Sequence, residues 1–507
     1  MLKTKNTSNN WFTLNFKLTR KEWKTNFFFL LPIILSSILF ASNNFVDNFM
    51  VTHINGGISA LSYANAWMGI IFAFLIGINI VGNMLVGQYK GTDNIKNINS
   101  SNRLRYFVSV SFATIFFIGS QISPEWFISF FARTNQGIGY ELGIRYIRIV
   151  SVTWITTAWI FVSSSICREL GSAKGILIVN IVSVSSNVLF NIIFLNILKM
   201  SVEGAAYATL ISNFFFVLTT VIIFLTRQKK YFVLPFAFWA VYKEIWIHYF
   251  KRIPTMVIST VSFLFIAIRA VFWNQTFHEG SVGEEHWALG AAVVLGITNS
   301  INNILTSAFP SVSASVSNFV GKNLGAGNIE EAKKEAQKLR GFNFVFSIGL
   351  SVVFSLVFMI ILNTNLFAGG VLDDVKTKMM QEGWTESAAI NEANTAASFY
   401  LKQIQYTLIP IIIFNPFWLW IITTSRAIGS GGRTNLTAVF DFVFNFLHVV
   451  FLAMLVYLVV PAIKNSVSNE ALLPIILFIF YAFEVVIKIP IYEYLFYHFK
   501  WAKKIYK

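Results

Sequence analysis

Charged residues and cysteines are scarce in this chain of 507 residues. Only 12% of the residues are Asp, Glu, Lys or Arg, whereas soluble domains carry about 25%. Hydrophobic residues make up 55% of the chain, and 53 residues are phenylalanine. This composition argues against a soluble enzyme. The single cysteine, Cys167, excludes a disulfide scaffold and any metal site built from several cysteines.

Twelve apolar segments are long enough to cross a membrane. A span needs about 20 mostly apolar residues, and backbone groups in lipid must be paired within the segment, so we expect helices. The predicted spans are residues 27–51, 60–87, 106–124, 145–166, 175–197, 204–226, 254–276, 288–320, 342–362, 404–424, 435–460 and 472–497. The first is too long for a cleaved signal peptide, and Pro310 predicts a bend in the eighth. The sequence therefore predicts an all-α, multi-pass protein of the cell membrane.

The basic residues predict which side of the membrane each loop faces. Most of the 39 Lys and Arg lie at the two termini and in the even-numbered loops, above all in residues 227–252 and 322–340. Positive residues are retained in the cytoplasm, so we expect both termini to be cytoplasmic. The net charge of +16 then indicates contact with membrane lipids and not with nucleic acid. We expect a monomer.

The sequence contains an internal duplication. The matching segments are residues 86–95 with 320–329, then Lys21, Glu22 and Pro32 with Lys243, Glu244 and Pro254, and Arg168, Gly171, Ser172 and Asn187 with Arg426, Gly429, Ser430 and Asn445. We predict two lobes of six helices each, residues 1–235 and 236–507, related by an axis along the membrane normal with a cleft between them. Such lobes are typical of carriers that alternate between inward- and outward-facing states. Two insertions lengthen the second copy, an acidic loop at 277–287 and a polar helix at 373–398.

Several of these motifs resemble the multidrug and toxic compound extrusion (MATE) family. They are Pro32 with Val46-Asp47, the Val-Gly-Gln-x-x-Gly loop after the second span and its copy after the eighth, Arg168-x-x-Gly171, Asn187 with Asn191, and Gly204 to Thr209. The resemblance runs from about Lys21 to Tyr497. It implies a transporter, not an enzyme, that exports amphipathic and often cationic compounds by antiport with Na⁺ or H⁺ and needs no cofactor. The family's ion site in the first lobe matches Asp47, Asn187, Asn191 and Thr209.

The residues themselves support an ion site in the first lobe. Asp47 is an acidic residue inside a span, which is costly and therefore a functional hypothesis by default. The fifth span adds a polar stripe at helical spacing, Asn180, Ser183, Asn187 and Asn191. Carboxylate and amide oxygens suit a hard cation such as Na⁺, and protonation of Asp47 is the alternative. These side chains could instead only form hydrogen bonds between helices.

The second lobe differs in its charges. Asp47 corresponds to Arg269, for which we expect a counter-charge from Asp441 or Glu484. Glu484 and Lys488 lie four residues apart and are predicted to pair on one helix.

Candidates for the substrate cleft are Trp67, Met68, Phe72 and Arg269. The aromatic faces of Trp67 and Phe72 attract organic cations. Arg168 and Arg426, just past the fourth and tenth spans, are candidates for gating.

Three other functions are compatible with the sequence. A flippase for lipid-linked sugars would keep the fold, although such relatives line the cleft with several basic residues and Arg269 is the only one deep in the first ten predicted spans. A membrane-bound acyltransferase would need His448, which a packing role explains more simply. A passive channel is the third. ATP binding is excluded, since neither Gly87 nor Gly321 belongs to a GxxxxGK[ST] motif.

Overall fold

The computed structural model describes residues 7–506, apart from 52–53, 55–56, 133–136, 235–236, 274–279, 283–285, 363–368, 465, 468 and most of 289–307. Helices account for nearly all of the described chain. The first half contains α1 (Thr7–Phe16), α2 (Arg20–Met50), α3 (Gly57–Lys90), α4 (Ile95–Ile122), α5 (Pro124–Ser129), α6 (Ile138–Glu169), α7 (Ala173–Asn191), the π-helical turn η1 (Ile192–Ile197) and α8 (Val202–Arg227).

The second half continues the helical architecture. It contains η2 (Lys229–Tyr231), η3 (Phe238–Ala240), α9 (Lys243–Phe250), α10 (Ile253–Trp273), α12 (Phe309–Ser315), η4 (Val316–Gly321), α13 (Lys322–Gly325), α14 (Ile329–Leu362), α15 (Gly369–Gln381), α16 (Glu386–Ile428), η6 (Gly429–Arg433), α17 (Thr434–Met454), η7 (Leu455–Val459), α18 (Val460–Ile463) and α19 (Asn469–His498). A short hairpin of β1 (Gly280–Val282) and β2 (His286–Ala288) falls in the predicted acidic loop.

The predicted spans agree with these helices where they are described. Nine stretches of the described residues are long and apolar enough to cross a membrane, and one of them, Glu386–Ile463, runs over both α16 and α17. Within the predicted eighth span, most of residues 289–307 lie outside the described residues, so the count of twelve is tested only in part. Pro310 occupies the first turn of α12, where a missing amide hydrogen costs nothing.

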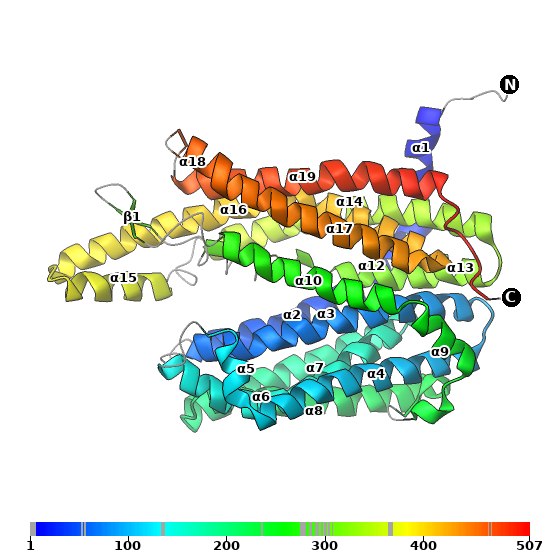
Figure 1. The fold of residues 1–507 in the computed structure, drawn as a ribbon, viewed down its shortest axis with the longest axis horizontal. Coiled ribbons are helices and arrows are strands. Elements are labelled where there is room, and N and C mark those ends of the chain that lie inside the picture. The colour runs from blue at the N-terminus through cyan, green and yellow to red at the C-terminus, as the bar shows by residue number, and fades with distance from the viewer. Residues whose placement is uncertain are drawn as a thin grey trace.

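The helices form two groups that lie side by side (Figure 1). Within the first group, α3 packs on α6, and α7 packs on α2 and α8. Within the second, α16 packs on α14 and α19, while α10 contacts both α17 and α3 of the first group. Each group buries its own apolar core, around Trp154 in the first and Tyr400 in the second. The N- and C-terminal ends lie at the same end of the bundle (Figure 1).

The inserted polar segment extends the opposite end of the molecule. α15 and the first turns of α16 lie side by side beyond the other helices, next to the β1–β2 hairpin (Figure 1). The sequence predicted one helix over 373–398, whereas the structure has a helical hairpin that turns at Gly383, whose φ is +88°. A left-handed backbone of this kind is readily adopted only by glycine.

Candidate functional site

A buried carboxylate forms the centre of the predicted ion site. Asp47 lies near the end of α2 and is only 5% exposed. Its Oδ1 accepts hydrogen bonds from Asn187 Nδ2 at 3.1 Å and from Asn191 Nδ2 at 2.8 Å. Its Oδ2 accepts a hydrogen bond from Thr209 Oγ1 at 2.8 Å. The structure therefore brings together all four residues, which come from α2, α7 and α8.

Two buried amide oxygens in this region have no hydrogen-bond partner among the described residues. They are Oδ1 of Asn191 and Oδ1 of Asn43, and Asn43 lies one helical turn before Asp47. Because buried polar atoms are normally paired, these oxygens are available to a further ligand. The donor set of carboxylate, amide and hydroxyl oxygens fits a hard cation, and the carboxylate alone can take up a proton. No group of three His, Cys, Asp or Glu gathers anywhere in the described part of the chain.

The rest of the polar stripe holds the helices of the site together. Asn180 Nδ2 donates to Ser36 Oγ of α2 at 2.8 Å, and Ser183 Oγ donates to the backbone oxygen of Ser212 in α8 at 3.4 Å. The stripe thus fixes α7 against both helices that contribute to the Asp47 site. Helix–helix hydrogen bonds thus involve Asn180 and Ser183, whereas Asn187 and Asn191 contact Asp47, where an ion site stays a prediction.

The corresponding position in the second lobe carries a guanidinium. Arg269 of α10 donates from Nη2 to Asn445 Oδ1 of α17 at 2.9 Å, and its guanidinium carbon lies 5.4 Å from the ring centre of Phe480. The expected ion pair between Arg269 and Asp441 or Glu484 is not formed within 4.0 Å among the described residues. The predicted direct contact was wrong, because α17 supplies an amide oxygen to Arg269 and Lys488 contacts both carboxylates. Glu484 still acts on Arg269 electrostatically from beyond 4.0 Å.

Lys488 is the cation shared by the two acidic residues of the second lobe. Its Nζ lies 2.7 Å from Glu484 Oε1, as the spacing of four residues predicted, and 3.7 Å from Asp441 Oδ1. Tyr492 donates a further hydrogen bond from its hydroxyl to Asp441 Oδ1 at 3.0 Å. These contacts hold α17 against α19.

His448 has the contacts of a packing residue. Its ring stacks on Phe480 with 3.6 Å between ring centres and 8° between planes. Its Nε2 lies 2.9 Å from the backbone oxygen of Phe480. A fully buried ring held in this way does not present a catalytic nitrogen to a substrate.

The aromatic candidates for a substrate cleft lie inside the first lobe. Trp67 is 5% exposed, donates from Nε1 to the backbone oxygen of Phe127 at 2.8 Å, and has its ring among those of α4 and α5. These contacts give Trp67 a packing role. Met68 and Phe72 are partly buried against the same core, and their role in substrate binding stays a prediction.

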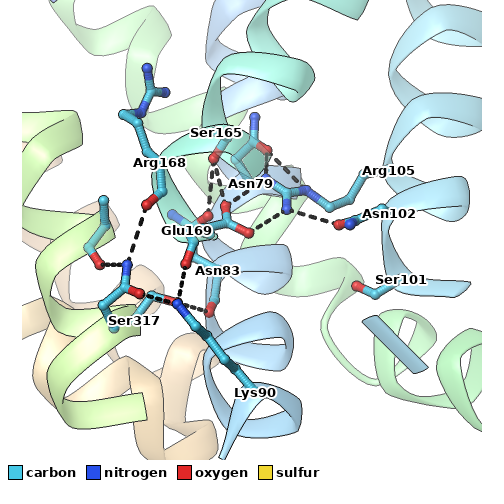
Figure 2. Close-up of polar contacts among 12 residues, drawn as sticks. Asn79, Asn83, Lys90, Ser101, Asn102, Arg105, Ser165, Arg168, Glu169 and Ser317 are labelled. Atoms are coloured by element: carbon cyan, nitrogen blue, oxygen red, sulfur yellow. Dashed lines mark hydrogen bonds and ion pairs between the residues drawn. The ribbon is translucent and has the colours of Figure 1, made fainter. Parts of the chain in front are cut away.

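A second buried cluster was missed from the sequence. Arg105 of α4 forms a two-pronged ion pair with Glu169 of α6, with distances of 2.8 Å and 2.9 Å, and both side chains are inaccessible (Figure 2). Asn79 of α3 accepts from Arg105, and Ser165 Oγ donates to Glu169 at 2.7 Å. Hydropathy placed Arg105 just outside the third span and Glu169 just past the fourth. The sequence does place these two opposite charges at neighbouring helix ends, and this could have indicated an ion pair.

The two copies of the duplicated glycine motif meet each other between the lobes. A Cβ on Gly321 would lie 3.1 Å from the Cα of Gly87, and a Cβ on Gly87 would lie 2.7 Å from Ser317 Oγ. Lys90 spans the same interface, donating from Nζ to the backbone oxygen of Glu169 at 3.0 Å and to Asn318 Oδ1 (Figure 2). We call the contact between residues 83–92 and 314–326 the lobe junction.

A C-terminal segment fastens the lobe junction. Residues 501–506, which we call the C-terminal strap, follow α19 and run across the end of α3. Gln88 donates from Nε2 to the backbone oxygens of Ser430 at 2.8 Å and Lys503 at 3.0 Å, and its Oε1 accepts from the Ile505 amide at 2.8 Å. Tyr506 donates to the backbone oxygen of Gln88 at 2.8 Å and stacks on Tyr89. One glutamine thus joins both lobes and the strap.

The duplicated arginines lie on either side of this junction. Arg168 lies in the last turn of α6 and accepts a hydrogen bond at its backbone oxygen from Asn318 Nδ2 at 3.3 Å, while its guanidinium points away from Lys90 (Figure 2). Arg426 lies in the last turn of α16 and lines a narrow cavity between the lobes. Their positions place both arginines where the lobes meet, and a gating role stays a prediction.

Known proteins resemble this chain in sequence. The sequence profile of the MatE family matches residues 32–193 and 289–366. A probable multidrug resistance protein, YpnP of Bacillus subtilis (strain 168), is 26% identical over 197 residues, a match that covers 36% of this chain and 42% of that protein.

The fold is shared over the whole length. A MATE structure in complex with MaL6 has a TM-score of 0.70 at 16% identity, with 97% of this chain and 99% of that chain covered. An outward-facing multidrug resistance MATE transporter of the MOP superfamily has a TM-score of 0.67 at 16% identity, with 97% and 98% covered. These structures share the two-lobed helical fold of this chain. The chain thus resembles the MATE family in sequence and shares the fold of MATE structures over nearly its whole length, as its motifs predicted.

Proposed function

We propose that this transporter exports amphipathic organic compounds, many of them cationic, in exchange for Na⁺ or H⁺ bound at Asp47. The observation that carries the proposal is the burial of one carboxylate among three polar side chains from two other helices. A carboxylate at that depth is costly unless it is used. The names of the relatives, which include a multidrug resistance protein and a multidrug resistance transporter, support the same class of cargo.

Ion binding at Asp47 would change the contacts between helices. The amino groups of Asn187 and Asn191 now point at the carboxylate, so a bound Na⁺ requires their oxygens to turn inward. Protonation would instead remove the charge that these donors stabilise. Either event alters the bonds that join α2 to α7 and α8. This is how occupancy of the site would shift the first lobe between its two arrangements.

The lobe junction supplies the other half of the cycle. If the termini are cytoplasmic, as the basic residues predict, the junction and the strap close the cytoplasmic side of the protein. Export would then require the Gly87–Gly321 contact to open for substrate loading and to close again for release outside. The binding of substrate and the binding of the ion would each favour one of the two arrangements of the lobes.

The test is dye efflux from proteoliposomes under imposed Na⁺ or H⁺ gradients, comparing wild type with Asp47→Asn. The control is Glu203→Gln, which removes a carboxylate whose only described ion pair, with Arg145, is 3.9 Å long. We expect gradient-driven ethidium efflux from wild type and from Glu203→Gln, and none from Asp47→Asn. Efflux of the same rate from Asp47→Asn would refute coupling at this carboxylate.

The same assay separates the alternative cargo. A flippase for lipid-linked sugars would show no dye efflux under either gradient although the protein is folded. Currents without an imposed gradient would indicate a channel.

A further inference from the structure

A cavity between the lobes contains an arginine without a counter-ion. Arg426 lines it from the last turn of α16, together with Ile80, Asn83 and Met84 of α3. Further wall residues come from α12, η4, η6 and α17. The cavity is narrow, so it accommodates a particle about the size of a water molecule and no organic substrate. Both lobes contribute to its walls.

The guanidinium of Arg426 is not neutralised by its surroundings. Its Nε is buried without a hydrogen-bond partner, and within the described part of the chain no carboxylate lies within 4.0 Å of it. The acid that acts on it electrostatically, Asp441, is already engaged by Tyr492 and Lys488. Arg426 as a whole is partly exposed, and its guanidinium lines the cavity with no described carboxylate in contact, so its charge is accessible to an anion there.

The charged side chains linked to Arg426 carry a net positive charge. Five charged side chains are linked in pairs in this part of the second lobe: the cations Arg269, Arg426 and Lys488, and the carboxylates Asp441 and Glu484. This group has one cation more than it has carboxylates. One monovalent anion would balance it.

Arg426 is the main hydrogen-bond donor of the cavity, because several hydroxyls in the wall already donate elsewhere. The hydroxyls of Ser317, Ser430 and Thr437 already donate to backbone oxygens, at 2.9, 2.7 and 3.0 Å. Ser313 supplies a further hydroxyl at the wall. A guanidinium beside a hydroxyl in a small, partly apolar cavity suits a compact anion.

We propose that this cavity binds a small inorganic anion, such as chloride, against Arg426. Because the walls come from both lobes, the bound anion stabilises the joined arrangement and has to leave before the lobes separate at this end. The site is distinct from Asp47, and its occupancy does not depend on which cation drives transport.

The first test is the thermal stability of the purified full-length protein in sodium chloride against sodium gluconate of equal concentration. Gluconate is too large for the cavity, so ionic strength is matched while the small anion is removed. The variant is Arg426→Gln and the control is Arg433→Gln, since Arg433 lies over the Phe499 ring at 5.0 Å and does not line the cavity. We expect chloride to raise the melting temperature of wild type and of Arg433→Gln, and the half-effective chloride concentration to rise at least about tenfold in Arg426→Gln. An equal chloride response in all three proteins would overturn the proposal.

A second measurement holds even if Arg426→Gln does not fold. Crystals of the wild-type protein grown in sodium bromide should show an anomalous scattering peak in contact with the Arg426 guanidinium. An ordered Arg426 with no peak beside it would overturn the proposal.

Discussion

Asn187 and Asn445 occupy corresponding positions in the two lobes and form opposite hydrogen bonds. Asn187 donates to the carboxylate of Asp47 at 3.1 Å, whereas Asn445 accepts from the guanidinium of Arg269 at 2.9 Å. Asp47 and Arg269 themselves correspond in the duplicated sequence. Because Arg269 already places a fixed positive charge in the second lobe, we expect an exchangeable cation to bind at Asp47 only.

Replacing Asn191 by aspartate should strengthen cation binding in the first lobe. Asn191 Nδ2 lies 2.8 Å from Asp47 Oδ1, so Asn191→Asp places a second carboxylate beside the first. Two anionic ligands attract a cation more strongly than one, and adjacent carboxylates resist simultaneous ionisation. We expect the Na⁺ concentration for half-maximal dye efflux to fall at least about tenfold. In Asn191→Leu it should rise, and unchanged values in both variants would contradict a site at Asp47.

Breaking the buried ion pair should destabilise the first lobe strongly. Glu169→Gln leaves Arg105 inaccessible to solvent and without its counter-ion, which costs about 3–5 kcal/mol. Denaturant unfolding of the detergent-solubilised protein measures the loss. The matched control is Glu125→Gln, because Glu125 pairs with Arg148 at 3.9 Å and both side chains are more than half exposed. An exposed pair contributes less than about 1 kcal/mol, so equal losses in the two variants would contradict this account.

A methyl group at Gly87 should block the joined arrangement of the lobes. In Gly87→Ala the new Cβ would lie 2.7 Å from Ser317 Oγ and 2.9 Å from the Ser317 backbone oxygen, which cannot move without shifting η4. We expect dye efflux to fall severely while the protein still inserts and folds. Gly349→Ala is the control, since no atom lies within 4 Å of its added Cβ and a helical Gly→Ala change is favourable by about 1 kcal/mol. Normal efflux in Gly87→Ala would show that close glycine packing is not required.

Removing the Gln88 side chain should release the strap. Gln88→Leu loses three hydrogen bonds to Ser430, Lys503 and Ile505, so trypsin should cleave after Lys503 faster than in wild type. The control is Gln228→Leu, which loses one bond to Ser172 within the first lobe. If both variants were cleaved at the wild-type rate, Gln88 would not be what holds the strap.

Much of the fold and the Asp47 site could be predicted from the sequence. Long apolar runs indicate membrane spans, and a segment in lipid has to be helical because its backbone groups must be paired within it. The repeated motifs revealed the duplication. Asp47, Asn187 and Asn191 were found because polar residues are rare inside spans and these recur at helical spacing. Thr209 was identified only through the resemblance to the family.

Other features depend on packing that hydropathy does not report. Arg105 and Glu169 lie at helix ends that look solvent-exposed in sequence, and only the approach of α4 to α6 makes them a buried pair. The partner of Arg269 was mispredicted because opposite charge suggested an acid, whereas the helix geometry supplied Asn445. Trp67 was chosen for its aromatic ring, but α5 covers it. The strap has no sequence signature, since Lys503 and Ile505 bond to Gln88 through backbone atoms and Tyr506 is its one described side chain that does so.

The strap also determines the order in which contacts between the lobes form during synthesis. Gln88 is synthesised early, at the end of α3, whereas residues 501–506 are made after every predicted span. The bonds between them can therefore form only when both lobes are already in the bilayer. During synthesis the first lobe therefore lies in the membrane without the bonds that later hold it to the second, and these bonds form only after residues 501–506 have been made.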